Sequence, residues 1–214
     1  MNGLTGYNPD EVSASLNSIK GAYDELLAVL GERMQNEIVN AMADKWACTN
    51  AQNFFNDAFK PAIDGLITSV NTTFESVVQS MNDAASRWAS EAGEAFSAVP
   101  FSPVNKTMDT SCILENISGI RGIDLDQASQ VAAKLPVLAA EAENAVSKAS
   151  NAVDTCGFVG GNQASNLKAS LETIRSNISN ATNEITTETK NAFESTISSY
   201  GNTEGQISQA FAGE

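Results

Sequence analysis

Four stretches of the sequence carry apolar residues at alternating steps of three and four, and no stretch alternates apolar and polar residues with a period of two. Steps of three and four place side chains on one face of an α-helix, whereas a half-buried β-strand buries every second residue. The four stretches are residues 8–45, 50–98, 124–154 and 162–200. The spacing therefore predicts an all-α chain with long helices and no sheet.

The apolar residues of each predicted helix form a seam like that of a coiled coil. The first seam begins at Val12 and Leu16 and shifts by one residue at Leu27. Pro61 in the second stretch and Pro136 in the third are expected to bend their helices, because an interior proline removes a backbone hydrogen bond. The most regular seam is the third, which consists of Ala128, Val131, Leu135, Leu138, Ala142, Ala145, Ala149 and Ala152.

Polar residues and a glycine mark where the predicted helices begin and end. Asn8 precedes a proline and two acidic residues, which is the pattern of a helix N-cap. Asp124, with Gln127 three residues later, is a second N-cap. Gly201 follows the last apolar residue of the fourth stretch and is expected to end that helix, so residues 201–214 are predicted to form a flexible tail.

We interpret the four helices as two helical hairpins. The first hairpin covers residues 1–98 with a turn near 46–50, and the second covers residues 124–200 with a turn near 155–162. Residues 99–123 lose the apolar spacing and contain prolines and glycines, so they are expected to form a linker.

Neither hairpin can bury the seams of both its arms alone, so packing one on the other predicts an elongated four-helix bundle. If both turns lie at the same end of the bundle, a short connection between the hairpins is enough. If the hairpins lie head-to-tail, the linker must travel most of the length of the rod, and about 25 extended residues reach at most about 80 Å. The long linker favours the head-to-tail arrangement.

Composition excludes several classes of function. The chain has no histidine, which removes histidine-dependent catalysis and histidine metal ligands. Its 12 basic against 26 acidic residues give a net charge of −14, which argues against nucleic acid and anionic membrane surfaces as partners. No apolar run is long enough to span a bilayer, so no membrane insertion is expected. Residues 1–9 lack the pattern of a cleaved signal peptide, so the protein is predicted to stay in the cytosol or to be exported by another route.

The three cysteines, Cys48, Cys112 and Cys156, are too few and too scattered for a disulfide framework or a zinc site. Parallel hairpins would bring Cys48 close to Cys156, whereas head-to-tail hairpins would separate them and could leave Cys112 near one of them. The three can equally be unrelated small residues. Because the paired carboxylates mostly fall on polar helix faces, we expect no metal, no cofactor and no enzymatic activity.

The turn between the first two helices reads Trp46-Ala47-Cys48. Two helices of about 40 residues, joined by a turn that begins with tryptophan, resemble the WxG family, the helical-hairpin substrates of bacterial type VII secretion. The turn departs from the family pattern because its third residue is Cys48 and not glycine. In the second hairpin the turn contains Cys156-Gly157-Phe158, where Phe158 can stand in for tryptophan. The alternative is that Trp46 has a structural role only and fills the end of the hydrophobic core.

Beyond the fourth helix, Tyr200 and Glu204 match the YxxxD/E export signal of the same family. Tyr7 and Glu11 have the same spacing at the opposite end of the sequence. The position of Tyr200 after the last predicted helix is where the family carries this signal. The alternative is a helix-terminal tyrosine that packs on the end of the bundle.

The resemblance implies a WxG pair fused into one chain, in which the tip of one hairpin lies beside the tail of the other. The expected partner is the secretion-system ATPase, which would recognise Trp46, Cys48, Tyr200 and Glu204 together. A homodimer or an extracellular protein target would follow once the folded protein is outside the cell. The competing hypothesis is a structural protein that assembles with itself, such as a phage, filament or adhesion component. A carboxylate or thiol enzyme is a third class.

Overall fold

The computed structural model describes residues 6–159 and 163–212, and within them the side chains of all residues except 163–164 and 204–212. The described chain is predominantly helical, which confirms the all-α prediction. Its strands are only two residues long, and they pair at the turns. Among the described helices, none has a stretch long and apolar enough to cross a membrane.

The two helical segments before the linker contain wide π-helical turns. In a π-helix the hydrogen bond spans one more residue than in an α-helix, so an apolar stripe moves on by one position. The first seam shifts at Leu27, which is where α1 gives way to η1. The elements of these segments are α1 (Pro9–Leu27), η1 (Ala28–Arg33), η2 (Gln35–Val39), α2 (Asn40–Met42), α3 (Thr49–Asn53), η3 (Phe54–Phe59) and α4 (Lys60–Glu91).

The helices after the linker are α5 (Leu125–Asp154) and α6 (Gln163–Ala212). All eight seam residues predicted for the third helix are buried in α5, and the helix continues through Pro136. The predicted end of the fourth helix at Gly201 is wrong, because α6 continues through it to Ala212. Gly201 does not adopt the positive φ of a helix-ending glycine, and a glycine inside a helix costs only about 1 kcal/mol.

The first hairpin also ends earlier than we expected. The last helix before the linker stops at Glu91 and not near residue 98. Gly93 has a φ of 73°, and its N–H donates to the Ser90 carbonyl at 3.1 Å. The N–H of Glu94 donates to the carbonyl of Ala89 at 2.8 Å. These two bonds form a Schellman motif, which closes a helix at a left-handed glycine.

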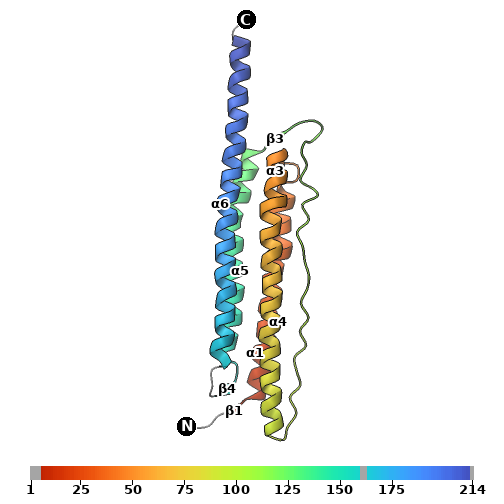
Figure 1. The fold of residues 1–214 in the computed structure, drawn as a ribbon, viewed down its shortest axis with the longest axis vertical. Helices are drawn as coiled ribbons and strands as arrows, with labels where there is room; N and C mark the ends of the chain where they lie inside the picture. The colour runs from red at the N-terminus through yellow and green to blue at the C-terminus, as the bar shows by residue number, and fades with distance from the viewer. Residues whose placement is uncertain (1–5, 160–162, 213–214) are drawn as a thin grey trace.

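Four helical segments lie side by side in an elongated molecule (Figure 1). α5 packs against α1 and α6, and α4 packs against the same two helices. The turn at Trp46 lies at one end and the turn at Cys156 at the other, while the linker runs extended along the outside between the two ends (Figure 1). α6 projects beyond the other helices at the Trp46 end (Figure 1).

Each turn is anchored by a short antiparallel bridge. β1 (Gly6–Tyr7) pairs with β4 (Phe158–Val159) at one end. β2 (Trp46–Ala47) pairs with β3 (Gly122–Ile123) at the other. In both cases the segment just before a long helix pairs with a turn that is distant in sequence.

The two predicted N-caps are confirmed and lie directly beside these bridges. The Asn8 side chain accepts hydrogen bonds from the backbone N–H groups of Asp10 and Glu11 at 3.1 and 3.4 Å. Asp124 accepts one from the N–H of Gln127 at 3.1 Å. The backbone N–H of each cap donates to the opposite turn, Asn8 to the Gly157 carbonyl at 2.9 Å and Asp124 to the Lys45 carbonyl at 2.6 Å.

Candidate functional site

Trp46 fills the end of the core from which α6 projects. Its side chain is 0% exposed. Its ring lies 4.9 Å from that of Phe193 on α6, and 5.7 and 6.0 Å from those of Phe54 and Phe55. The turn is therefore held to α6 by the edge-on contact between Trp46 and Phe193. Among the described residues, nothing accepts a hydrogen bond from the indole Nε1, so the turn keeps an unsatisfied buried donor.

Cys48 is the N-cap residue directly before α3. It is 8% exposed and has a φ of −173°, an extended conformation that any residue can adopt. The backbone at this position therefore does not require the glycine of the family pattern. Its side chain makes no capping hydrogen bond to the helix it starts.

Tyr200 lies on α6 next to this turn and is 37% exposed. It lines a small hollow of about 180 Å³ together with Cys48 and Arg121. Partial burial raises the pKa of the Tyr200 phenol above its ordinary value, the nearby Cys48 adds to the rise, and Arg121 opposes it. Arg121 is itself paired with Glu115 at 2.6 Å. Glu115 also lines the hollow, and the remaining residues around it are Thr49, Asn50, Thr196 and Ser199.

The structure thus brings Trp46, Cys48 and Tyr200 to one end of the molecule. Tyr200 lies inside α6 and not in a tail. The side chain of Glu204, the fourth predicted recognition residue, lies outside the described residues. The similarly spaced Tyr7 and Glu11 lie at the opposite end, where Tyr7 pairs with Phe158 and its ring packs on that of Phe96 at 6.4 Å.

The second turn is closed by a glycine instead of a large side chain. Gly157 has a φ of 73°, and a Cβ added there would lie 2.7 Å from the Cβ of Glu11 and 3.0 Å from the backbone oxygen of Asn8. Cys156 beside it is buried, and Phe158 is half-buried. The structure therefore places Cys156, Gly157 and Phe158 together, away from Trp46.

The strand pairing shows which residues of the two turns occupy equivalent positions. The sequence alone did not reveal this correspondence. Tyr7 pairs with Phe158 just before α1, and Ile123 pairs with Trp46 just before α5. Phe158 therefore corresponds to Trp46, and in sequence Gly160 then corresponds to Cys48. The second turn reads Phe158-Val159-Gly160 in sequence, so a glycine stands where the first turn has Cys48. The sequence prediction used residues 156–158 instead, and Gly160 lies outside the described residues.

All three cysteines are free, and Cys48 and Cys156 lie at opposite ends. Cys112 lies with its Sγ 3.9 Å from the Oδ1 of Asn40, and partial burial raises the pKa of its thiol. A raised pKa leaves less of the reactive thiolate at neutral pH. Among the described side chains, no three of the residue types that bind metals come together.

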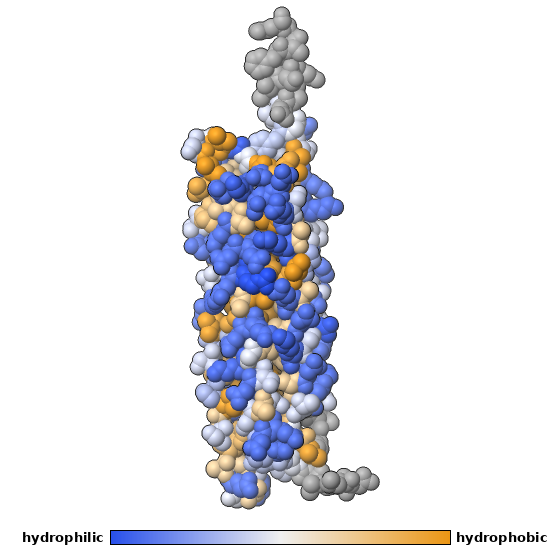
Figure 2. All heavy atoms as spheres, turned by 180° about the vertical axis from the view of Figure 1, so that it is seen from behind, coloured by the Kyte–Doolittle hydropathy of each residue, from blue (hydrophilic) through white to orange (hydrophobic). Residues whose placement is uncertain are grey.

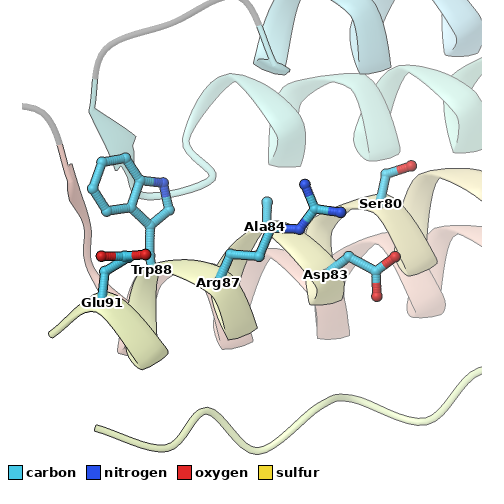
Figure 3. A pocket seen from close by; sticks show the side chains of 6 residues that line it. All are labelled: Ser80, Asp83, Ala84, Arg87, Trp88 and Glu91. Carbon is cyan, nitrogen blue, oxygen red and sulfur yellow. The ribbon is translucent and has the colours of Figure 1, made fainter. Parts of the chain in front are cut away.

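A larger hollow of about 480 Å³ lies on the last turns of α4 (Figure 3). All the residues around it belong to that one helix, so they do not converge on a ligand from different sides. The charged groups are Asp83, Arg87 and Glu91, and the others are Ser80, Ala84 and Trp88.

Residues singled out by sequence therefore come together from distant segments at both ends of the described chain, Trp46 with Tyr200 at one end and Tyr7 with Phe158 at the other. The polar and charged groups at the Trp46 end include Tyr200, Arg121 and Glu115, and among the described residues no cluster that could hold a metal lies there. Comparisons with protein families, with curated proteins and with solved structures found no match.

Proposed function

We propose that this chain is a non-enzymatic substrate of a bacterial type VII secretion system, exported as a folded protein. In this proposal it is a tandem pair of WxG-like hairpins, packed head-to-tail into one four-helix bundle. The secretion-system ATPase is the partner inside the cell, and a protein target is the partner outside.

The equivalence of the two bridges is the observation that carries the proposal. The segment before α1 pairs with the second turn, and the segment before α5 pairs with the first turn. Both helix caps also donate to the opposite turn. Such reciprocal contacts are expected of two like hairpins related by an approximate two-fold axis, as in a dimer whose interface uses the same patch on both partners.

The end at Trp46 and Tyr200 supplies the recognition surface in this proposal. Trp46 is fully buried, so it acts by fixing the turn against Phe193 of α6. Tyr200 is exposed and lies beside Cys48 of the first turn, so it offers a side chain to a partner. A partner that binds here tests whether the turn and α6 are correctly packed together, and thereby distinguishes folded from unfolded protein.

Export of variants from a bacterium that carries a type VII system tests the proposal. Tyr200→Ala should lower the secreted fraction at least about tenfold, because it removes the exposed side chain of the signal. Tyr7→Ala is the matched control, since it changes the same Tyr-x-x-x-Glu spacing at the other end. Helicity by circular dichroism should be the same in both variants. Equal export of Tyr200→Ala and the unchanged protein would contradict the proposed signal.

Deletion of residues 200–214 should abolish export and leave the remaining helices intact by the same measure. The head-to-tail packing has its own test, which is peptide mapping after mild oxidation. A disulfide between Cys48 and Cys156 within one chain would contradict that packing, because the two lie at opposite ends of the molecule.

Self-assembly is the second candidate, and the exposed apolar residues at the same end favour it. Figure 2 shows apolar surface near the end from which α6 projects. Ile120 is 72% exposed, and Leu114, Leu125 and Ile197 are exposed near it. Light scattering that rises without limit as protein concentration increases would support a scaffold over a closed bundle. A constant monomer mass would contradict the scaffold.

A further inference from the structure

The linker packs between α4 on one side and α1 with its π-helical continuation η1 and η2 on the other, and we call this seat the groove between α1 and α4. We call residues 99–113 the strap. Met108 and Ile113 of the strap are buried, and the ring of Phe101 packs edge-on against that of Tyr23 at 4.8 Å. The strap is therefore part of the core, although no helix or strand lies within its described residues.

Side chains of the groove bind the backbone of the strap. Asn82 pairs with both backbone groups of Val99, at 2.9 and 3.0 Å. Gln35 pairs in the same way with both groups of Asp109, each at 2.8 Å. An amide side chain that donates to the carbonyl and accepts from the N–H of one residue makes the hydrogen bonds that a neighbouring strand would make. Because these bonds go to the backbone, they do not depend on the identity of that residue's side chain.

Two further strap residues are held in the same way by pairs of side chains. The Val104 N–H donates to the Tyr23 hydroxyl at 2.7 Å, and its carbonyl accepts from Asn71 at 3.1 Å. The Met108 N–H donates to the Asp64 carboxylate at 2.7 Å, and its carbonyl accepts from Lys60. Both backbone groups of four strap residues are thus satisfied by helix side chains.

The spacing of these groups on α4 matches an extended chain. Asn82, Asn71 and Asp64 are eleven and seven residues apart, close to whole numbers of helical turns, so they share one face. At a rise of about 1.5 Å per residue they are about 16 and 10 Å apart along the helix. The strap residues they hold, Val99, Val104 and Met108, are five and four residues apart, or about 16 and 13 Å at about 3.3 Å per residue.

The groove is also shaped for the strap. Gly31 lies inside a helical segment, and a Cβ there would lie 2.6 Å from the Cδ of Lys106. The absence of a side chain at Gly31 lets Lys106 cross the helix and pair with Glu32 at 2.5 Å. Both ends of the strap are free of helices, since α4 has already closed at Gly93 and the strap is followed by an exposed turn at residues 114–119.

We propose that the groove between α1 and α4 is a binding site for an extended peptide strand, that the strap is its resident occupant, and that the strap of a second copy of this chain can replace it. The second copy is the occupant that fits, because it carries Met108 and Ile113 at the spacing of the buried positions. Exchange opens only the segments before residue 99 and after residue 113, and it leaves every helix intact. The result is a dimer in which the two copies have traded straps.

The experiment uses the whole chain, folded first and then cut. Protease recognition sequences are inserted between Glu94 and Ala95 and between Ser118 and Gly119, on either side of the strap. After cleavage, native mass spectrometry should find the strap still bound. A fluorescent synthetic peptide of residues 97–115, added in excess, should then replace it and raise the fluorescence anisotropy.

Two changes locate the binding. A peptide with Met108→Asp should bind at least about tenfold more weakly, because a charge would replace a buried side chain. The groove variant Asn82→Ala should weaken binding of the unchanged peptide, whereas Thr72→Ala, on the exposed face of α4, should not. Loss of the strap on cleavage with unchanged helicity, or equal binding of both peptides, would overturn the proposed site.

Exchange between whole chains is tested by refolding two differently tagged copies together at high concentration. Dimers that carry both tags, and that are absent when the copies are folded separately and then mixed, would support exchange. If the labelled peptide binds but refolded chains remain monomers, the second copy is not an occupant and that part of the proposal is wrong.

Discussion

The two turns of this molecule are anchored alike but filled differently. Each pairs through a two-residue bridge with the segment before the opposite helix. The first turn then buries Trp46 among the rings of Phe54, Phe55 and Phe193. The second brings Gly157 so close to α1 that a side chain there would collide with its first turn. The two turns thus share a backbone arrangement, but a large side chain, Trp46, fills the first turn, and a residue without a side chain, Gly157, permits the close packing of the second.

The difference teaches which feature of a turn sequence carries the fold. The bridge and the donated cap hydrogen bond recur at both ends, so they do not need tryptophan. The rings around Trp46 lie at the end from which α6 projects, where Phe193 contacts the turn. Trp46 therefore couples the turn to α6, and the following changes test that coupling against the opposite end.

Trp46→Ala should have the largest effect. It removes a fully buried ring, which costs about 3–5 kcal/mol of unfolding free energy. Phe158→Ala, at the corresponding position of the half-buried turn, should cost about 1 kcal/mol. Chemical denaturation followed by circular dichroism measures both. Trp46→Phe is the control that keeps a ring and removes the unpaired donor. Equal costs for the two alanine variants would contradict the view that only the first turn depends on a buried ring.

Gly157→Ala should cost about 2 kcal/mol, because alanine is strained at a φ of 73° and its Cβ would collide with α1. Gly201→Ala is the matched control, since a Cβ there meets nothing within 4 Å. That substitution inside a helix should stabilise the protein by about 0.5–1 kcal/mol. Thermal denaturation of the two variants gives the sign of each effect, and a stabilised Gly157→Ala would show that the close approach is not strained.

Cys48→Ser should raise the stability of the first turn by about 0.5–1 kcal/mol, because serine can cap the start of α3 where cysteine makes no capping bond. Cys156→Ser should not, since Cys156 does not begin a helix and is buried. Denaturation midpoints under reducing conditions compare the two. A loss of stability in Cys48→Ser would mean that the buried thiol packs too well to be replaced.

The smallest expected effect is on the pH dependence. Burial raises the pKa of Tyr200 in the folded protein, so the folded state favours the neutral phenol. The associated stability is present below the ordinary tyrosine pKa of about 10 and is lost as pH rises through the higher folded value. Tyr200→Phe should therefore lose less stability than the unchanged protein on going above pH 10. Equal losses would place the Tyr200 phenol in full contact with water.

Much of the helical pattern could be predicted from sequence, because burial in a helix leaves a direct periodic trace. All eight α5 seam residues are buried, and the seam shift at Leu27 marks the start of a π-helical turn. Helix ends were less predictable. Gly93 ends a helix, whereas Gly201 lies inside a helix. The two glycines differ in backbone conformation, because Gly93 has a positive φ and Gly201 does not.

The candidate site was only partly accessible to sequence reasoning. The resemblance singled out Trp46 and Tyr200, but nothing in the sequence shows that Phe193 connects them. The strap was read as a plain linker, because its hydrogen bonds go to side chains on other helices and leave no periodic signal. The correspondence between the two turns also required the strand register, in which Tyr7 pairs with Phe158, 151 positions later.

The position of the two ends of the described chain has a mechanical consequence. The start of β1 and the end of α6 lie at opposite ends of the long axis (Figure 1). A force that pulls these ends apart therefore acts parallel to the helices and loads the contacts of α6 with α4 and α5 in shear, all at the same time. A force that grips α6 alone and pulls it sideways would instead peel those contacts away one turn after another. The bundle should therefore resist unfolding by a force along its axis better than unfolding by a force across it.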